Sequence, residues 1–355
     1  AKSKESEIYK EWAWGNYKYQ SKSKKNLLYI KDQKELEFLN FYSDCINFSR
    51  DLINSPANKL NPSTYYSKIR NNNLFKSFNF IDYTEKEINS NFPLTCAVGK
   101  SSSSKPKVIE ITNRKLSKKD KPLVIIGKGV TFDTGGVNIK PGTSMRNMKK
   151  DMGGSAIAIS LFLLANYFLK KTKIVLIAPI AENAISSKSM RPGDVYSSVS
   201  GKSVEIAHTD AEGRLLLADA IEKASSYNPC MIIDFATLTG AARVALGEDL
   251  PAYFCNNETF AKKIENLNKE KLRCWRLPLY SPYLFKIKSQ VADLSNASLD
   301  GMAGSITAAL FLQEFLKSPN IPWFHFDTFA WSQDSKGAAL QGLDIMSDFL
   351  RKNFN

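Results

Sequence analysis

Histidine is nearly absent from this chain, and its cysteines show no pairing pattern. The 355 residues include two histidines and five cysteines, and no two cysteines form a CxxC pair. This composition disfavours a disulfide-stapled fold, a structural zinc knuckle and a histidine-rich metal site. Any metal site would have to be built mainly from oxygen donors.

Long hydrophobic stretches are also lacking. The longest apolar run, around residues 156–169, is interrupted by Ser160 and Asn166 and is too short to span a bilayer. The N-terminal region shows no signal-peptide pattern. We therefore expect a cytoplasmic protein with no membrane segment.

Positive charge is in excess, with a formal net charge of +14. The lysines concentrate slightly at 21–25 and 115–121, and neither stretch is interleaved with the aromatic side chains that stack on single-stranded nucleic acid. A solvated surface explains them better than a nucleic-acid site. A DNA-binding or regulatory protein stays open as an alternative, and it would bind duplex DNA with a steep salt dependence.

Helical and strand patterns alternate from about Arg50 onward. Apolar runs predict buried strands at 122–127, 173–180 and 230–236. Periodic segments predict helices at 33–54, 154–170, 212–227 and 306–317, whereas 12–19 is interpreted as a short strand or linker. This order predicts an α/β fold with a central, largely parallel mixed sheet and helices on both faces.

Two glycine-rich segments concentrate the charged side chains of special interest. These are Lys128, Asp133, Lys140 and Asp151 in the first segment, and Asp210, Glu212 and Arg214 in the second. Both segments lie beside predicted strand ends or helix starts, where α/β sheets bind ligands. Carboxylates are preferred by hard divalent ions, and a metal pair needs a bridging carboxylate. The combination predicts two divalent metal ions with a lysine amine as an unusual extra ligand.

The second segment also indicates an anion site. Asp210 and Glu212 are two residues apart, so their side chains point the same way in an extended chain, and Arg214 continues that face. A helix beginning here would leave the backbone N–H groups of Gly213 and Leu215 free beside the arginine. In isolation, acidic capping of a helix explains this segment better, and only the combination with the lysines and glycines favours the metal site.

These segments resemble the signatures of the leucyl aminopeptidases (cytosol aminopeptidases), which are dinuclear-metal exopeptidases. They read IGKGVTFDTGGVNIKPG at 126–142, MKKDMGG at 148–154 and HTDAEGRL at 208–215. The resemblance continues through RPGDV, DFATLTGA, WRLPL and AGSITAALFL, at 191–195, 234–241, 275–279 and 303–312. It implies a catalytic domain at 50–355, a remnant of an N-terminal domain and linker at 1–49, peptide substrates and a homohexamer.

The resemblance implies a role at the metals for each acidic residue. Asp133 and Glu212 would bridge the two ions. Asp210 would bind the more exchangeable ion, while Lys128 and Asp151 would complete the tighter site. Lys128 could then ligate only as the neutral amine, so its pKa would have to fall well below the usual value. Zinc or manganese fits this ligand set, and magnesium or cobalt is also suitable.

The resemblance also implies how a peptide bond would be hydrolysed. Lys140 would stay protonated and polarise the scissile carbonyl. Arg214 would hold a bicarbonate anion that acts as the general base, which suits a hydrolase with almost no histidine. Met148, Thr237 and Gly240 match positions that line the pocket for the N-terminal side chain, and this predicts a preference for Leu- or Met-like residues. Core packing is the competing explanation for Met148 and Thr237.

The chain departs from the family pattern in two places near these motifs. His208 stands where asparagine is usual, and we expect it to make a hydrogen bond behind the metal ligands rather than to ligate. The segment 325–331 matches the family pattern H-x-D-x-x-x-x-A-W only with a shortened middle, which leaves its loop geometry open. A dinuclear phosphoesterase is a further alternative, but such sites usually include histidine ligands, of which this chain has too few.

Overall fold

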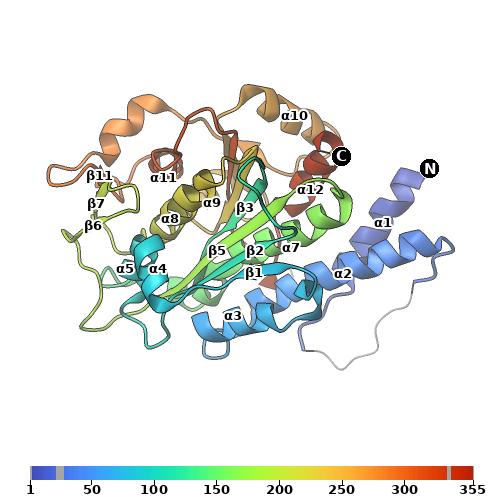
Figure 1. The fold of residues 1–355 in the computed structure, drawn as a ribbon, viewed down its shortest axis with the longest axis horizontal. Coiled ribbons are helices and arrows are strands. Elements are labelled where there is room, and N and C mark those ends of the chain that lie inside the picture. The colour runs from blue at the N-terminus through green and yellow to red at the C-terminus, as the bar shows by residue number, and fades with distance from the viewer. Residues whose placement is uncertain (1, 21–27, 334–336, 355) are drawn as a thin grey trace.

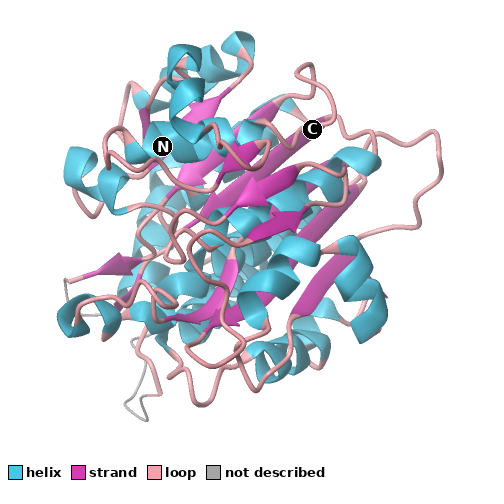
Figure 2. Ribbon diagram, turned by 90° about the vertical axis from the view of Figure 1, so that its left-hand side faces the viewer, coloured by secondary structure: helices cyan, strands magenta, loops and turns pink. Residues whose placement is uncertain are grey.

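A nine-stranded mixed sheet runs through the protein, of which the computed structural model describes residues 2–20, 28–333 and 337–354. Its strands follow the order β1 (Asn79–Ile81), β2 (Lys107–Thr112), β5 (Ile174–Asn183), β3 (Leu123–Gly127), β8 (Met231–Ala236), β12 (Trp323–Asp327), β9 (Ala252–Cys255) and β10 (Trp275–Arg276), with β4 (Gly129–Asp133) paired to β5. The pairs from β5 through β3 and β8 to β12 are parallel, whereas β1–β2, β2–β5 and β12–β9 are antiparallel. The predicted sheet is therefore confirmed (Figure 2).

Side chains of the central strands alternate between two hydrophobic layers. In β3, Leu123 and Ile125 enter one layer and Val124 and Ile126 enter the other, because successive strand residues point to opposite faces. The first layer is completed by α2 (Gln33–Asn54), α7 (Gly153–Phe168) and α12 (Leu343–Asn353). The second is completed by α5 (Pro93–Gly99), α8 (Gly213–Ser226) and α11 (Gly304–Gln313). Helices thus cover both faces (Figure 1).

Shorter elements surround this three-layered body. The helices are α1 (Lys2–Gly15), α3 (Pro62–Arg70), α4 (Glu85–Asn91), α6 (Gly142–Met145), α9 (Gly240–Leu246) and α10 (Glu258–Asn268), with 3-10 turns η1 (Asn73–Phe75), η2 (Met148–Met152) and η3 (Ser281–Ile287). Two small sheets contain β6 (Val195–Ser197), β7 (Ser203–Glu205) and β11 (Leu294–Ser295), and β13 (Trp331–Ser332) and β14 (Gly337–Ala338). The basic stretch at 21–25 lies outside the described residues, and 115–121 forms a largely exposed loop.

The sequence-based elements agree with the structure except at a few ends and one segment. Helix 33–54 is found as predicted, whereas β5 extends three residues farther, to Asn183, and α11 ends at Gln313. The interpretation of 12–19 as a strand or linker is wrong for its first residues, which belong to α1. Packing explains this helix, because α1 lies on α2 and Trp14 donates to the Tyr42 hydroxyl at 2.8 Å.

The predicted domain boundary between residues 49 and 50 lies within the continuous helix α2. This helix packs against α7, and the Ser49 hydroxyl donates to the carbonyl of Ala156 at 2.8 Å. Residues 148–168, which include α7, are long and apolar enough to cross a membrane, but 83% of their most apolar window is buried inside the fold. That burial is typical of a core helix.

The carboxyl ends of the parallel strands meet at one edge of the sheet, and α7 begins directly beside them. A Cβ atom at Gly154 would lie 2.2 Å from the carbonyl oxygen of Phe235 in β8. Glycine therefore allows the first turn of α7 to rest on the end of β8. Because η2 leads straight into α7, this close approach also places Asp151 at the strand ends.

Asp219 caps a helix that lies far from it in the chain. Its buried carboxylate, on α8, accepts the backbone N–H of Thr95 at 2.7 Å and the Thr95 hydroxyl at 2.8 Å, at the start of α5. The residue before α5, Phe92, provides no side-chain cap. The Asp219 carboxylate thus binds donors that would otherwise be buried without a partner.

We expect Asp219→Asn to lower the free energy of unfolding by about 1–3 kcal/mol. The asparagine side chain has one NH₂ group in place of a carboxylate oxygen, and this NH₂ group would face an N–H or O–H donor at the start of α5. Urea unfolding followed by circular dichroism would measure the loss. The exposed Asp249→Asn substitution is the matched control and should leave the unfolding midpoint unchanged. Equal stability of the two variants would contradict the capping role.

Candidate active site

Lys128 organises one half of the site, directly after β3. Its backbone N–H donates to the carbonyl of Phe235 at 3.0 Å, which holds it between the ends of β3 and β8. Its ammonium group lies 2.8 Å from Oδ2 of Asp151 and 3.0 Å from Oε1 of Glu212, and it donates to the carbonyl of Thr237 at 2.7 Å. All these side chains are buried. Lys128 therefore joins three separate segments of the chain.

The start of α8 approaches Lys128 very closely. A Cβ atom at Gly213 would lie 2.4 Å from Cε and 2.7 Å from Nζ of Lys128. Any side chain at this position would displace the lysine. Glycine thus allows Glu212, one residue earlier, to bring its carboxylate to the ammonium group.

Lys140 organises the other half of the site, in the loop that follows β4. Its Nζ lies 2.9 Å from Oδ2 of Asp133 and also contacts Oδ1 of Asp210. The other oxygen of Asp133 accepts the backbone N–H of Gly135 at 2.9 Å and the side-chain amide of Asn183 at 2.8 Å. Asp133 is therefore held by the backbone on one side and presents its second oxygen to Lys140.

Asn138 and Thr209 bind the two charged segments to each other. The N–H of Thr209 donates to Oδ1 of Asn138 at 2.9 Å, and the N–H of Asn138 donates to Oγ1 of Thr209 at 2.9 Å. Asn183 donates to the carbonyl of Thr209 at 3.1 Å. Sequence reasoning missed these three residues, because contacts 71 and 26 residues apart leave no local pattern.

Burial close to other carboxylates raises the pKa of two acids of the cluster, Glu212 and Asp210. Burial and then the charge of Asp133 raise the pKa of Glu212 well above its ordinary value. The same two causes raise the pKa of Asp210 to about 6. Each carboxylate thus disfavours ionisation of the next, so the cluster requires added positive charge.

The neighbouring carboxylates favour the charged form of the two lysines, Lys128 and Lys140. Burial lowers the pKa of Lys128, but the charges of Asp151 and Glu212 outweigh it, so the pKa lies above its usual value. Lys140 behaves in the same way, with Asp133 as its main partner. Both lysines are therefore ammonium ions when carboxylates alone surround them. The neutral amine at Lys128 stays a prediction for the metal-loaded site.

The donor set fits divalent metal ions. Asp133, Asp210 and Glu212 each offer an oxygen atom, and these atoms lie within 4.8 Å of one another. Three buried oxygens, on Asp151, Asp210 and Glu212, lie against lysine ammonium groups, so that four carboxylates share two ammonium groups. Burying such oxygens is costly, and a divalent ion bound to them would offset the cost.

Arg214 lies in the first turn of α8 and faces the same cavity. It donates to the carbonyl of Asn296 at 2.5 Å, while its buried Nε finds no hydrogen-bond partner among the described residues. A small anion in the cavity would satisfy this donor. The prediction of a free N–H at Leu215 is wrong, because that group donates to the carbonyl of Glu212 at 3.0 Å as the helix closes its first turn.

One cavity of about 560 Å³ brings the predicted site residues together. Its walls include Lys128, Asp133, Lys140, Met148, Asp151, Asp210, Glu212, Arg214, Thr237 and Gly240. The hydroxyl of Thr237 donates to Oδ1 of Asp151 at 2.7 Å. Thr237 therefore holds a candidate metal ligand in place as well as lining the cavity, and core packing alone does not describe it.

His208 lies at the exposed rim of the cavity, behind Asp210. Its Nδ1 accepts the backbone N–H of Asp210 at 3.2 Å. Asn296 holds the same turn from a loop 88 residues away, because it accepts the N–H of His208 at 3.1 Å and donates to the carbonyl of Ala211 at 3.2 Å. The hydrogen-bonding geometry of His208 is thus the one expected, whereas Asn296 could not be recognised from the sequence.

The shortened segment 325–331 holds the loop that carries Thr237. Asp327, at the end of β12, accepts the N–H groups of Leu238 at 3.2 Å and Thr239 at 3.1 Å. It also accepts the hydroxyl of Ser305, in the first turn of α11, at 3.0 Å. The loop left open by the sequence therefore has a defined geometry, with Asp327 as its anchor.

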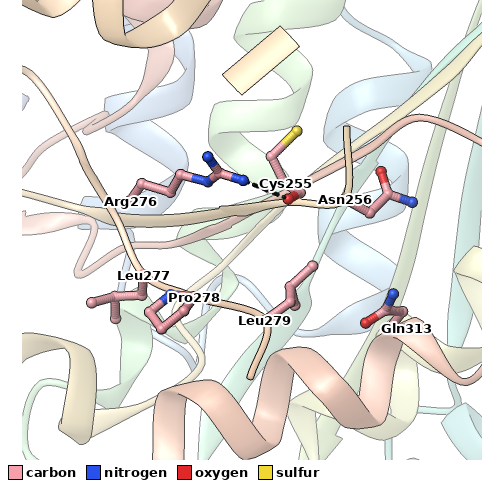
Figure 3. Close-up of a pocket in the computed structure, with 7 residues that line it drawn as sticks. All are labelled: Cys255, Asn256, Arg276, Leu277, Pro278, Leu279 and Gln313. Carbon is pink, nitrogen blue, oxygen red and sulfur yellow. Dashed lines mark hydrogen bonds between the residues drawn. The ribbon is translucent and has the colours of Figure 1, made fainter. Parts of the chain in front are cut away.

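Another hollow of about 560 Å³ lies at the β9–β10 edge of the sheet (Figure 3). Arg276 donates to Glu258 at 2.8 Å, and its guanidinium group reaches the carbonyl of Cys255 at 3.5 Å. The described residues that line this hollow include no carboxylate. It therefore lacks the donors that distinguish the first cavity.

Comparison with known proteins agrees with this site. The model of the catalytic domain of the cytosol aminopeptidase family matches residues 47–346. The chain belongs to the cytosol aminopeptidase family. This membership gives no support to a DNA-binding protein or a phosphoesterase, the two alternatives that the sequence left open.

Relatives in the family are longer than this chain. A probable cytosol aminopeptidase of Syntrophotalea carbinolica is 38% identical over 298 residues, which cover 83% of this chain and 59% of that protein. The cytosol aminopeptidase of Encephalitozoon cuniculi is 41% identical over 288 residues, which cover 79% and 58%. The chain therefore spans less than two-thirds of the length of these relatives.

Solved structures from the family share the fold. The cytosol aminopeptidase from Coxiella burnetii aligns with a TM-score of 0.88 and 37% identity, covering 99% of this chain and 78% of that one. The bottromycin maturation enzyme BotP, in complex with Mn, aligns with a TM-score of 0.88 and 28% identity, covering 99% and 79%. The family's fold is therefore retained over nearly the whole chain.

We expect the metal-free protein to lose stability as the pH rises from about 4 to about 7. The pKa of Asp210 is about 6 in the folded protein and 3.8 in the unfolded chain. Between pH 3.8 and pH 6 the folded protein therefore binds more protons than the unfolded chain. The stability that Asp210 contributes when protonated is lost as the pH rises through this range. The contribution of Asp210 is on the order of 3 kcal/mol, at about 1.4 kcal/mol per pKa unit. Urea unfolding in EDTA at both ends of this range would measure it.

Asp210→Asn removes this titrating group and should make the pH dependence of the metal-free protein less steep, while Glu212, whose pKa is also raised, still contributes. Added Mn²⁺ should restore stability to the unsubstituted protein at pH 7, because it offsets the repulsion between carboxylates. An identical slope in both proteins would show that Asp210 titrates normally.

Proposed function

We propose that this protein is a metal-dependent aminopeptidase that removes the N-terminal residue from peptides. The observation that carries the proposal is the convergence of four carboxylates and two lysines in one cavity at the strand ends: Lys128, Asp133, Lys140, Asp151, Asp210 and Glu212. Membership of the cytosol aminopeptidase family supports the same activity.

Lys128, Asp133, Asp151, Asp210 and Glu212 would hold two divalent ions. Bound there, they supply a water activated near neutral pH and a binding point for the free α-amine of the substrate. Zinc and manganese are the ions we propose, with magnesium or cobalt as substitutes. An amine requirement of this kind restricts the reaction to chain ends.

Lys140 and Arg214 have the roles that do not involve ligation. Lys140 is partly exposed to the cavity and remains protonated, so it can polarise the scissile carbonyl and stabilise negative charge on its oxygen. Arg214 is buried with a free Nε, and we propose that it holds bicarbonate as the general base. Because the chain has few histidines, a bound anion can supply the proton acceptor.

The remaining features of the proposal concern substrate and assembly. Met148, Thr237 and Gly240 line the cavity and favour a Leu- or Met-like N-terminal side chain. We further propose a cytoplasmic homohexamer, in which residues 50–355 form the catalytic domain and 1–49 the end of an N-terminal domain and its linker. The names of the relatives, cytosol aminopeptidases, support the location.

Cleavage of leucine p-nitroanilide in the presence of Mn²⁺ or Zn²⁺ tests the activity. EDTA should abolish it, and Asp133→Asn or Glu212→Gln should lower kcat/KM by more than about 100-fold, because the loss of a ligand costs more than the loss of an outer-shell partner. The exposed Glu270→Gln substitution serves as a control with the same loss of charge. Activity that survives chelation would refute the proposal.

Bicarbonate dependence tests the role of Arg214. In buffer freed of carbon dioxide, added bicarbonate should raise kcat, and Arg214→Met should lower kcat by about 100-fold and remove the stimulation, as expected for loss of a general base. Arg214→Lys keeps the charge without the planar fork and should recover only part of the rate. Stimulation that persists in Arg214→Met would place the anion elsewhere.

A further inference from the structure

Lys150 is a buried lysine in the wall of the active-site cavity that the proposed chemistry does not use. Its side chain is 5% exposed, and its ammonium group makes no ion pair or hydrogen bond with the described residues. The carboxylate of neighbouring Asp151 is already occupied by Lys128 and by the hydroxyl of Thr237. Lys150 therefore faces the cavity as a positive charge without a partner.

Burying an unpaired ammonium group costs free energy, so its presence needs an explanation. The ring of Phe329, centred 4.3 Å from Nζ of Lys150, offsets part of the cost through a cation–π contact. A methionine would fill the same space without that cost. A lysine is useful here if an anion enters the cavity.

Arg243 provides a second cation at the same ring. Its guanidinium carbon lies 4.7 Å from the centre of Phe329, it projects from α9, and it is exposed to solvent. Both cations line the cavity that contains Met148 and Gly240. We call Lys150, Arg243 and Phe329 the cationic corner.

We propose that the cationic corner binds a carboxylate on the N-terminal side chain of the substrate, so that peptides beginning with glutamate are cleaved as well as those beginning with Leu- or Met-like residues. This inference rests on the aminopeptidase function proposed above. The methylene stem of glutamate would occupy the space of a leucine side chain beside Met148, and its carboxylate would meet the ammonium group of Lys150. Arg243 would contact the same carboxylate from the side of the cavity that is open to solvent.

A comparison of glutamate with glutamine isolates the charge, because the two side chains have nearly the same size and shape. In the metal-loaded protein, kcat/KM for glutamate p-nitroanilide should exceed that for glutamine p-nitroanilide by about 10-fold or more, the usual range for a hydrogen bond to a charged group. Lys150→Met should reduce this ratio to near unity. Arg243→Met, at an exposed position, should reduce it by a smaller factor.

Lys149→Met is the matched control, because it removes the same charge one residue away. The ammonium group of Lys149 donates to the carbonyl of Asn54 at 2.9 Å and is not part of the cavity wall. The ratio should stay unchanged in this variant. Calorimetric titration of the metal-loaded protein with free glutamate and glutamine supplies a readout independent of turnover, and Lys150→Met should weaken glutamate binding alone.

The C-terminal carboxylate of a dipeptide is the other carboxylate that the cationic corner could bind. Leucylglycine and leucylglycine amide differ only in that group. If Lys150→Met lowers cleavage of the acid relative to the amide and leaves the glutamate-to-glutamine ratio unchanged, the corner binds a chain terminus and the inference is overturned. Folding of each variant would be checked by circular dichroism, and Arg243→Met decides the question if Lys150→Met does not fold.

Two kinds of failure can be told apart. Cleavage of leucine p-nitroanilide without any preference for glutamate over glutamine overturns this inference and leaves the aminopeptidase intact. Absence of cleavage of every anilide, with Mn²⁺ or Zn²⁺ present, overturns both.

Discussion

Repulsion among four buried carboxylates is the constraint on which the site depends. Lys128 and Lys140 are the two ammonium groups that pair directly with these four carboxylates, so each ammonium group is shared between two acids. The fold sustains this arrangement by fixing the chain around it, through the end of β3, the glycine that begins α8 and the pair Asn138 and Thr209. Electrostatic strain of this kind is typical of sites prepared for cations.

Lysine appears three times in this cavity, and each time its surroundings give it a different character. Lys128 contacts Asp151 and Glu212, Lys140 contacts Asp133 and Asp210 at the opening, and Lys150 lies over the ring of Phe329. The roles we propose for these lysines, as metal ligand, electrophile and recognition group, differ in the same way. Burial and the nearest charge decide which, since both act directly on the ammonium group.

Much of the fold and the charged cluster could be predicted from the sequence, because both leave local patterns. Helix 33–54 has a periodic apolar face, the central strands are continuous apolar runs, and the acids and lysines of the cluster lie in two short glycine-rich segments. Asn183 and Asn296 left no such pattern, since they act on segments distant in the chain. For the same reason, the packing that makes residues 12–15 helical and the anchoring of the 237–239 loop by Asp327 could be learned only from the structure.

The clamp formed by Asn296 on the 207–211 turn also bears on how the protein is made. The site draws on segments from Lys128 to Asp327, and the turn that carries Asp210 is held from a loop 88 residues later. A growing chain released from the ribosome in order therefore exposes its acidic cluster well before the residues that lock it in place have been synthesised. The cavity can therefore be completed only after Asn296 and Asp327 have been synthesised.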